Sequence, residues 1–142
     1  MLLNRKAVLF YSSWSQRDQM GRPAINTVFN HTAQDKEDFN VTAPADQRTA
    51  FGGKFRTNVI DTLTSFGWDA PTAGAIADFL LPDVVTYDTR TVANGAAFNG
   101  RALQDDVIDA ELAVTTHNNV KSDCVPAHTD YLSSFPYLGL PH

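Results

Sequence analysis

The sequence has a single cysteine, Cys124, among 142 residues. An internal disulfide framework is therefore excluded, but the compartment stays open because many exported bacterial proteins have no disulfides. His117 and His128 are the only soft ligands near it, and their spacing is loose. A structural Zn²⁺ site takes four ligands in closely spaced pairs, so we expect a free cysteine and loop histidines rather than zinc or a cysteine nucleophile.

Basic residues, long apolar runs and catalytic motifs are also scarce. The chain has 11 Lys and Arg against 16 Asp and Glu, a net charge of −5, so we expect no nucleic-acid partner. No apolar run reaches the roughly 18 residues of a membrane span, and the N-terminus has no signal-peptide core. A phosphate-binding loop and a G-x-S-x-G motif are both missing from the sequence.

What the chain does have is the composition of a folded domain. Hydrophobic residues make up 43% and aromatic residues 11%, which is enough to build a core in a chain of this length. Neither a repeat nor a low-complexity segment divides the sequence. We therefore predict one domain over residues 1–142.

The N-terminal part predicts two strands. Lys6–Trp14 carries apolar residues on both faces, which is typical of a covered strand. Ala24–Asn30 alternates after Pro23, a residue that fits the first position of a strand. We expect these two segments to pair as a β-hairpin.

The middle of the chain predicts helices. Thr32–Asn40 has the composition of a short helix with Thr32 as N-cap. Lys54–Phe66 carries apolar residues at helical spacing and is followed by Gly67, and Asp69–Leu81 is the next helix. The short link between the two longer helices predicts an αα-hairpin.

A further strand and an aromatic tail complete the expected fold. Val84–Tyr87 is rich in β-branched residues, and Tyr131–His142 carries aromatic residues that we expect to lie extended over the core. The fold class predicted from these elements is α+β: an N-terminal β-hairpin packed with an αα-hairpin, a further C-terminal helix and the tail.

That C-terminal helix belongs to the segment Phe98–Leu112, which begins with a turn. Asn99-Gly100 tolerates positive φ angles, and Asp105 or Asp106 can cap the helix that follows. Side chains in this segment also alternate in a way that would fit a strand, but we favour a helix. The apolar face expected for that helix consists of Val107, Ile108, Leu112 and Thr115.

The same segment holds the candidate ligand-binding residues, Arg101, Asp105, Asp106 and Asp109. In the first interpretation they are structural: the aspartates cap the helix and the arginine pairs with a carboxylate. In the second they bind Ca²⁺, which prefers oxygen ligands, although the spacing is not that of the D-x-[DN]-x-[DN]-G loop. In the third they are catalytic carboxylates, which requires surroundings that separate their pKa values.

Five blocks, taken in order, resemble a known bacterial family. The blocks are Met20–Val28, Lys36–Asn40, Leu81–Asp83 with Tyr87-Asp88, Asn99–Arg101 with Asp105–Asp109, and Phe135–Leu138. Over Met20–His142 the chain is similar to the C-terminal third of a family known only as a domain of unknown function. Its members are mostly exported, several hundred residues long and β-rich in their N-terminal part. The resemblance implies an exported or periplasmic location and no particular catalytic residue or cofactor.

The chain lacks the long N-terminal part of that family. We therefore expect a truncated or stand-alone version of a C-terminal region that acts as a non-enzymatic binding or structural module. An unpaired edge of the strand Lys6–Trp14 favours a protein partner or self-association as a homo-oligomer. The alternative is a Ca²⁺-dependent or carboxylate-based hydrolase-like enzyme centred on Arg101, Asp105, Asp106 and Asp109.

Overall fold

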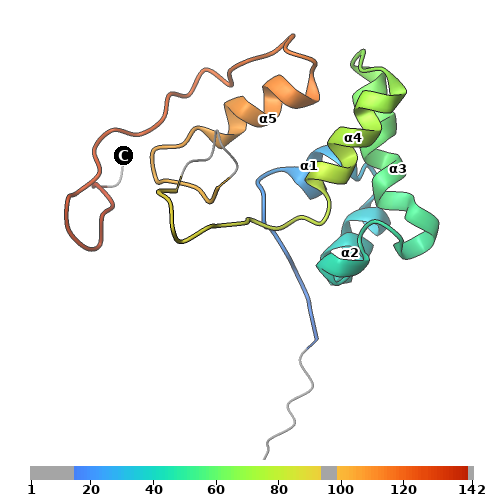
Figure 1. Cartoon of the computed structure of the whole chain (residues 1–142), viewed down its shortest axis with the longest axis horizontal. Coiled ribbons are helices and arrows are strands. Elements are labelled where there is room, and N and C mark those ends of the chain that lie inside the picture. Colours follow the sequence, from blue (N-terminus) through green and yellow to red (C-terminus); the bar gives the residue numbers. More distant parts are fainter. Residues whose placement is uncertain (1–14, 94–98, 141–142) are drawn as a thin grey trace, which may run out of the picture.

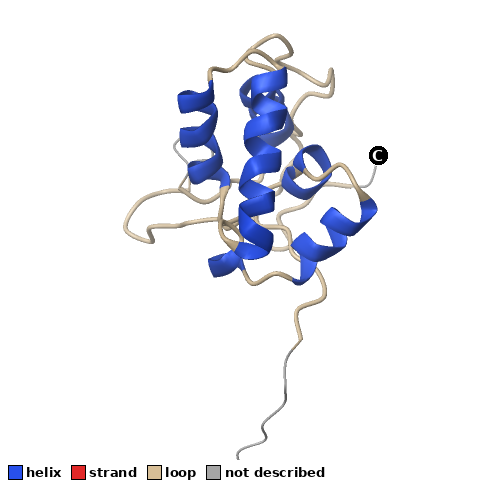
Figure 2. Cartoon of the chain, turned by 90° about the vertical axis from the view of Figure 1, so that its right-hand side faces the viewer, coloured by secondary structure: helices blue, strands red, loops and turns tan. Residues whose placement is uncertain are grey.

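The structure is a computed structural model that describes residues 15–93 and 99–140, and its regular elements there are helical (Figure 1). The elements in order are α1 (Ile25–Phe29), α2 (Ala33–Val41), the 3₁₀ helix η1 (Pro44–Asp46), α3 (Ala50–Ser65), α4 (Ala70–Leu80) and α5 (Val107–Thr115). Figure 2 shows loops but neither strand nor hairpin between these helices in the described ranges. The predicted α+β class is therefore wrong. No helix in these ranges is long and apolar enough to cross a membrane.

The predicted N-terminal hairpin is not found. Its first arm, residues 6–14, lies outside the described residues, and its second arm is the helix α1. Asn26 and Asn30 explain the helix, because they are four residues apart and the amide of Asn30 donates a 2.9 Å hydrogen bond to Asn26 Oδ1. Asn58 of α3 donates to Asn30 Oδ1 at 3.0 Å, so both ends of the buried Asn30 amide are hydrogen-bonded in the helical arrangement.

The predicted αα-hairpin is present as α3 and α4. Gly67, with φ of 102°, ends α3 in a Schellman motif: its N–H donates to the Thr64 carbonyl, and the N–H of Trp68 donates to the Leu63 carbonyl. The Asp69 side chain caps α4 by accepting from the Thr72 N–H at 3.0 Å. The core lies between this pair and the first two helices, and its largest buried side chains include Phe39, Phe55, Ile25, Leu63 and Leu81.

Two local features of the bundle of α1 to α4 follow from the side chains next to them in the sequence. Thr32 caps α2, as predicted, by accepting from the Asp35 N–H at 3.0 Å. Gly52 and Gly53 hold positive φ angles inside α3 and kink it, so the regular helix begins near Lys54. The Lys54 ammonium group bridges Asp35 at 2.7 Å and Asp38 at 3.0 Å, which joins α3 to α2.

Residues 82–93 lead away from α4, and residues 99–106 lead back to α5 from a corner at Asn99. Val84–Tyr87 is a loop and not the expected strand. The Asn99 side chain accepts from the Asp88 N–H at 2.6 Å, and the Gly100 N–H donates to the Thr86 carbonyl at 2.7 Å. These bonds hold Asn99 and Gly100 beside residues 86–88, and Gly100 has a positive φ of 71°, as the sequence predicted that it could.

The C-terminal tail does not lie over the core. Within its described residues, Phe135 is 83% exposed and Leu140 is 84% exposed. Figure 1 shows the red end of the ribbon running away from α1 to α4, beyond α5. The expectation that the aromatic residues of the tail cover the core is therefore wrong.

Candidate functional site

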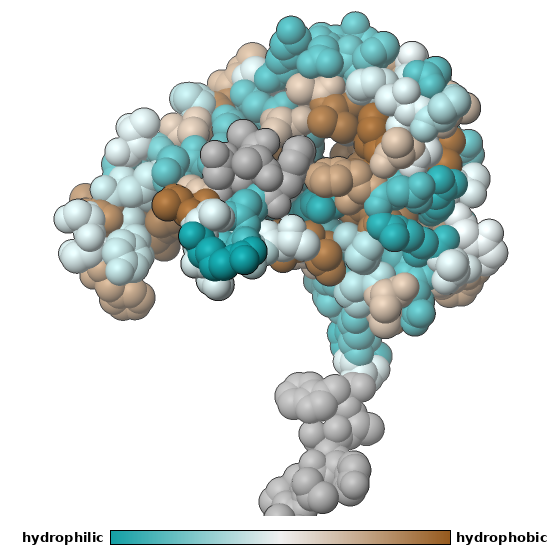
Figure 3. Space-filling view, in the orientation of Figure 1, coloured by the Kyte–Doolittle hydropathy of each residue, from teal (hydrophilic) through white to brown (hydrophobic). Residues whose placement is uncertain are grey.

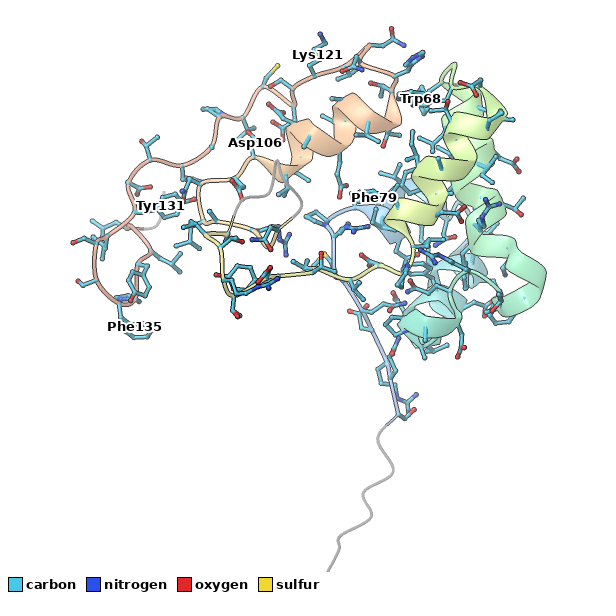
Figure 4. All side chains as sticks on the ribbon, in the orientation of Figure 1. Trp68, Phe79, Asp106, Lys121, Tyr131 and Phe135 are labelled. Atoms are coloured by element: carbon cyan, nitrogen blue, oxygen red, sulfur yellow. The ribbon has the colours of Figure 1, made fainter. Side chains whose placement is uncertain are left out.

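Helix α5 stands apart from the bundle and is joined to it at one end. The indole Nε1–H of Trp68 donates a 2.8 Å hydrogen bond to the Val114 carbonyl oxygen. The Trp68 ring also packs on the His117 ring, with centroids 4.1 Å apart. Figure 4 places Trp68 between the top of α4 and the C-terminal end of α5. This contact anchors α5 and leaves a space below it.

That space is a cavity of about 640 Å³ bordered by α4, α5 and the loop after α4. Most of its walls are apolar, and the larger side chains are Ile25, Phe29, Trp68, Ile76, Phe79, Val85, Val107 and Val114. Figure 3 shows brown, hydrophobic residues beside the hollow between α5 and α4. A cavity of this size and lining falls within the range of small-molecule sites.

The α5 wall of the cavity is one helical stripe. Val107, Ala110, Glu111 and Val114 follow one another at intervals of three, one and three residues, so they share a face. Two residues of the face predicted from the sequence, Val107 and Thr115, do line the cavity, whereas Ile108 is 36% exposed and does not. Glu111 belongs to the stripe that faces the cavity, so its carboxyl group lies in the cavity wall.

Arg22 forms the polar floor of the cavity. Its Nη1 donates to the carbonyl oxygens of Phe79 at 2.8 Å and Leu80 at 2.9 Å, so the guanidinium group satisfies the C-terminal end of α4. Its backbone N–H donates to Asp83 Oδ1 at 2.6 Å. Burial lowers the pKa of Arg22, and the carboxylates of Asp83 and Glu111 oppose that change.

Glu111 is the titratable group that the cavity perturbs most. Burial, with a smaller contribution from the negative charge of Asp83, raises its pKa to about 7, while Arg22 and Arg101 act in the opposite direction. Within residues 15–93 and 99–140 the carboxyl group takes part in no hydrogen bond or ion pair. At neutral pH it is therefore present in both protonation states and has hydrogen-bonding capacity for a ligand.

The aspartates predicted from the sequence mainly hold the backbone. Asp105 Oδ2 accepts from the Ala102 N–H at 2.7 Å, and Asp106 Oδ1 caps α5 by accepting from the Asp109 N–H at 3.1 Å. Asp109 Oδ1 accepts from the Asp123 N–H at 2.9 Å and is not part of the cavity wall. These contacts agree with the structural interpretation of the aspartates, and the described residues include no cluster arranged to hold a metal ion.

Arg101, Asp105 and Asp106 do line the cavity, so part of the predicted set lies at the site. Sequence reasoning missed Arg22, Asp83 and Glu111. The spacing of Val107, Ala110, Glu111 and Val114 could have identified Glu111, because it places a carboxylate within an apolar stripe. No sequence signal joins Arg22 and Asp83 to that stripe, since they meet only in the folded chain.

The chain matches no protein-family model, no curated protein and no solved structure in the three comparisons. The family resemblance and the exported location it implies therefore stay predictions.

Proposed function

We propose that this protein is a non-enzymatic binding module and that the cavity between α4 and α5 receives a small, mainly apolar molecule. The observation that carries this proposal is the cavity itself, about 640 Å³ in volume with largely apolar walls. A ligand there would bury apolar surface that α5 leaves uncovered, and this burial supplies the driving force for binding.

The aspartates favour binding over the hydrolase-like alternative. Asp105, Asp106 and Asp109 each use a carboxylate oxygen to accept a backbone N–H. A hydrolytic pair needs two carboxyl groups that face a common substrate with separated pKa values, and a Ca²⁺ ion needs six to eight converging oxygens. The three aspartates support the loop and helix around the cavity in place of either arrangement.

A neutral apolar dye, N-phenyl-1-naphthylamine, tests the proposal. Ala75 of α4 and Ala110 of α5 line the cavity and are exposed enough to accept a larger side chain. We expect saturable fluorescence enhancement with the native chain and its loss in Ala75→Trp and Ala110→Trp. The matched control is Ala70→Trp, an exposed position of α4 outside the cavity, which should bind the dye normally. Equal dye binding by all four proteins, or none by the native chain, contradicts the proposal.

A second candidate function is self-association through the C-terminal tail. Its exposed apolar side chains are Leu132, Phe135, Tyr137, Leu138 and Leu140. The segment is locally ordered, since the Leu132 N–H donates to the Tyr137 carbonyl at 2.9 Å and the Tyr137 N–H donates to the Ser134 carbonyl at 2.8 Å. An exposed apolar segment of fixed shape favours a second copy of the chain as its partner.

Size-exclusion chromatography with light scattering tests this second candidate. We expect the native chain to form a dimer and the double variant Phe135→Ser, Leu138→Ser to be monomeric. The control Phe66→Ser removes an exposed aromatic residue from the end of α3 and should leave the dimer intact. A monomeric native chain at high concentration excludes self-association.

A further inference from the structure

The charged groups that face Glu111 come from three parts of the chain. Arg22 precedes α1, Asp83 follows α4, and the loop before α5 contributes Arg101, Asp105 and Asp106. Acidic groups, with Glu111 itself, therefore outnumber basic ones around the cavity by four to two. Their field favours a cation over an anion in the adjoining space.

The two arginines offset part of this balance, since both lower the pKa of Glu111, but each is engaged or screened. Arg22 directs Nη1 to the carbonyls of Phe79 and Leu80, where it offsets the negative end of α4. Arg101 is exposed, so solvent and salt screen its charge. The Glu111 carboxyl group is more buried than Arg101 and, among the described residues, has no hydrogen-bonding partner. Arg101 also lines the cavity, so a ligand that reaches past its exposed side chain meets the more buried carboxyl group of Glu111 as a polar contact.

We infer that the cavity binds an amphiphilic primary amine, whose apolar chain lies along Phe79, Ile76 and Val107 and whose ammonium group pairs with Glu111. The inference rests on the proposed binding function and specifies the class of ligand. An ammonium group satisfies the buried carboxylate with a charge-assisted hydrogen bond. An alkyl carboxylate would instead bring a negative charge toward Glu111, Asp83, Asp105 and Asp106.

This pairing makes binding depend on pH in a defined direction. Glu111 must be ionised to pair with ammonium, and burial in the cavity raises its pKa to about 7. An alkylamine stays protonated well above neutrality, as a lysine side chain does. The ionisation of Glu111 therefore determines how the affinity varies with pH. Affinity should therefore fall about tenfold for each pH unit below about pH 6, where the ionised fraction of Glu111 falls in proportion.

The experiment measures displacement of N-phenyl-1-naphthylamine by decylamine, decanoic acid and decanol from about pH 5 to about pH 8, below their aggregation concentrations. The proteins are the native chain, Glu111→Gln and Glu37→Gln, which changes the other glutamate of the sequence at an exposed position. Circular dichroism confirms that each variant is folded. Shortening decylamine by one methylene should weaken binding about fourfold if the chain is buried.

We expect decylamine to displace the dye best near pH 8 and to lose affinity toward pH 5. Glu111→Gln should bind it more weakly at pH 8 with a flat pH profile, while Glu37→Gln should match the native chain. The pH profile of the native chain tests the inference even if Glu111→Gln does not fold. Decanoic acid binding at least as well as decylamine overturns the ammonium assignment, as does a native affinity that is independent of pH. In both cases saturable dye binding still supports the proposed binding function. If the native chain does not bind the dye, the proposed function itself is contradicted.

Discussion

Trp68 and Val114 are joined by a 2.8 Å hydrogen bond from the indole Nε1–H to the carbonyl oxygen. Trp68 follows the Schellman motif of α3, so its ring is held in place by the end of that helix. The bond fixes the C-terminal end of α5 against the bundle, while the corner at Asn99 fixes the segment that leads into its start. The cavity exists because α5 is held at these points and not packed along its length.

Replacing Trp68 with Phe should loosen α5. The variant keeps an aromatic ring but loses the 2.8 Å indole bond, so the Val114 carbonyl keeps the longer 3.4 Å bond from the His117 N–H. We expect a loss of about 1 kcal/mol in the free energy of unfolding. Amide hydrogen exchange in α5 should accelerate more than exchange in α3. Phe66→Leu is the control, since Phe66 is exposed and not part of the cavity wall. Unchanged exchange in α5 would show that this bond does not anchor the helix.

Glu111 should make stability decrease as pH rises through neutrality. Its pKa is about 7 in the folded chain against an ordinary value of 4.5, so the folded state binds the proton more tightly. Its stabilising contribution is complete below about pH 4.5 and is lost as pH rises through about 7. Such a change of pKa corresponds to about 3 kcal/mol for a fully buried group, and partial exposure reduces the expected effect to about 1–2 kcal/mol.

Denaturant unfolding of the native chain and Glu111→Gln at several pH values measures this contribution. The variant should gain stability relative to the native chain between about pH 5 and about pH 8, because it has no proton to lose. Glu37→Gln controls for the loss of one negative charge at an exposed site. A constant difference between native and variant proteins across this range would contradict the raised pKa.

Gly21 should not tolerate a side chain. A Cβ atom there would lie 2.4 Å from the Asp83 carbonyl oxygen and 2.8 Å from the Val84 Cα, and neither backbone atom is free to rotate away. We expect Gly21→Ala to cost about 1–3 kcal/mol and to displace Asp83 from the backbone N–H of Arg22. Urea denaturation measures the loss.

Gly74→Ala is the matched control for that experiment. Its Cβ would meet only the end of the Arg56 side chain, at 3.4 Å, and it lies inside α4, where alanine is favoured over glycine by about 0.5–1 kcal/mol. The two alanine substitutions should therefore have opposite or clearly unequal effects on stability. Equal effects would mean that the close approach of Gly21 to Asp83 is not rigid.

Asp106→Ala should destabilise the start of α5. Loss of the bond from the Asp109 N–H to Asp106 Oδ1 removes the N-cap, at a cost of about 1 kcal/mol. Asp61→Ala, at an exposed position of α3, should change the free energy of unfolding by less than about 0.5 kcal/mol. Equal losses in the two variants would remove the capping role.

Calcium should leave the melting temperature unchanged. A cation that binds only the folded state raises the melting temperature by mass action, but Asp105, Asp106 and Asp109 each direct one carboxylate oxygen to a different backbone N–H group. Differential scanning fluorimetry with millimolar Ca²⁺ and with Mg²⁺ as control checks this. A rise specific to Ca²⁺ that disappears in Asp106→Ala would restore the metal-site interpretation.

Local signals in the sequence were sufficient for several elements. Thr32 predicts the N-cap of α2, Gly67 predicts the end of α3, and the pair Asp105-Asp106 predicts the start of α5, where Asp106 is the N-cap. Each depends on a side chain and backbone groups within a few residues of it, so the same geometry forms wherever the rest of the chain lies. Asn99-Gly100 is different: Gly100 has the predicted positive φ, but the bonds that hold this segment reach Thr86 and Asp88 and so depend on the tertiary structure.

Alternation misled the prediction at Ala24–Asn30. Ile25, Thr27 and Phe29 are spaced by two residues, which fits one face of a strand, but Ile25 and Phe29 are four residues apart, which also fits one face of a helix. The sequence by itself determined the helix caps, the helical spacing of α3 and α4 and the excess of acid. Only the tertiary structure decided that α1 is a helix, through the amide contacts of Asn30 with Asn26 and Asn58. It also decided that Glu111 shares a cavity with Arg22, since residues so far apart in the sequence become neighbours only when Trp68 holds α5 beside the bundle.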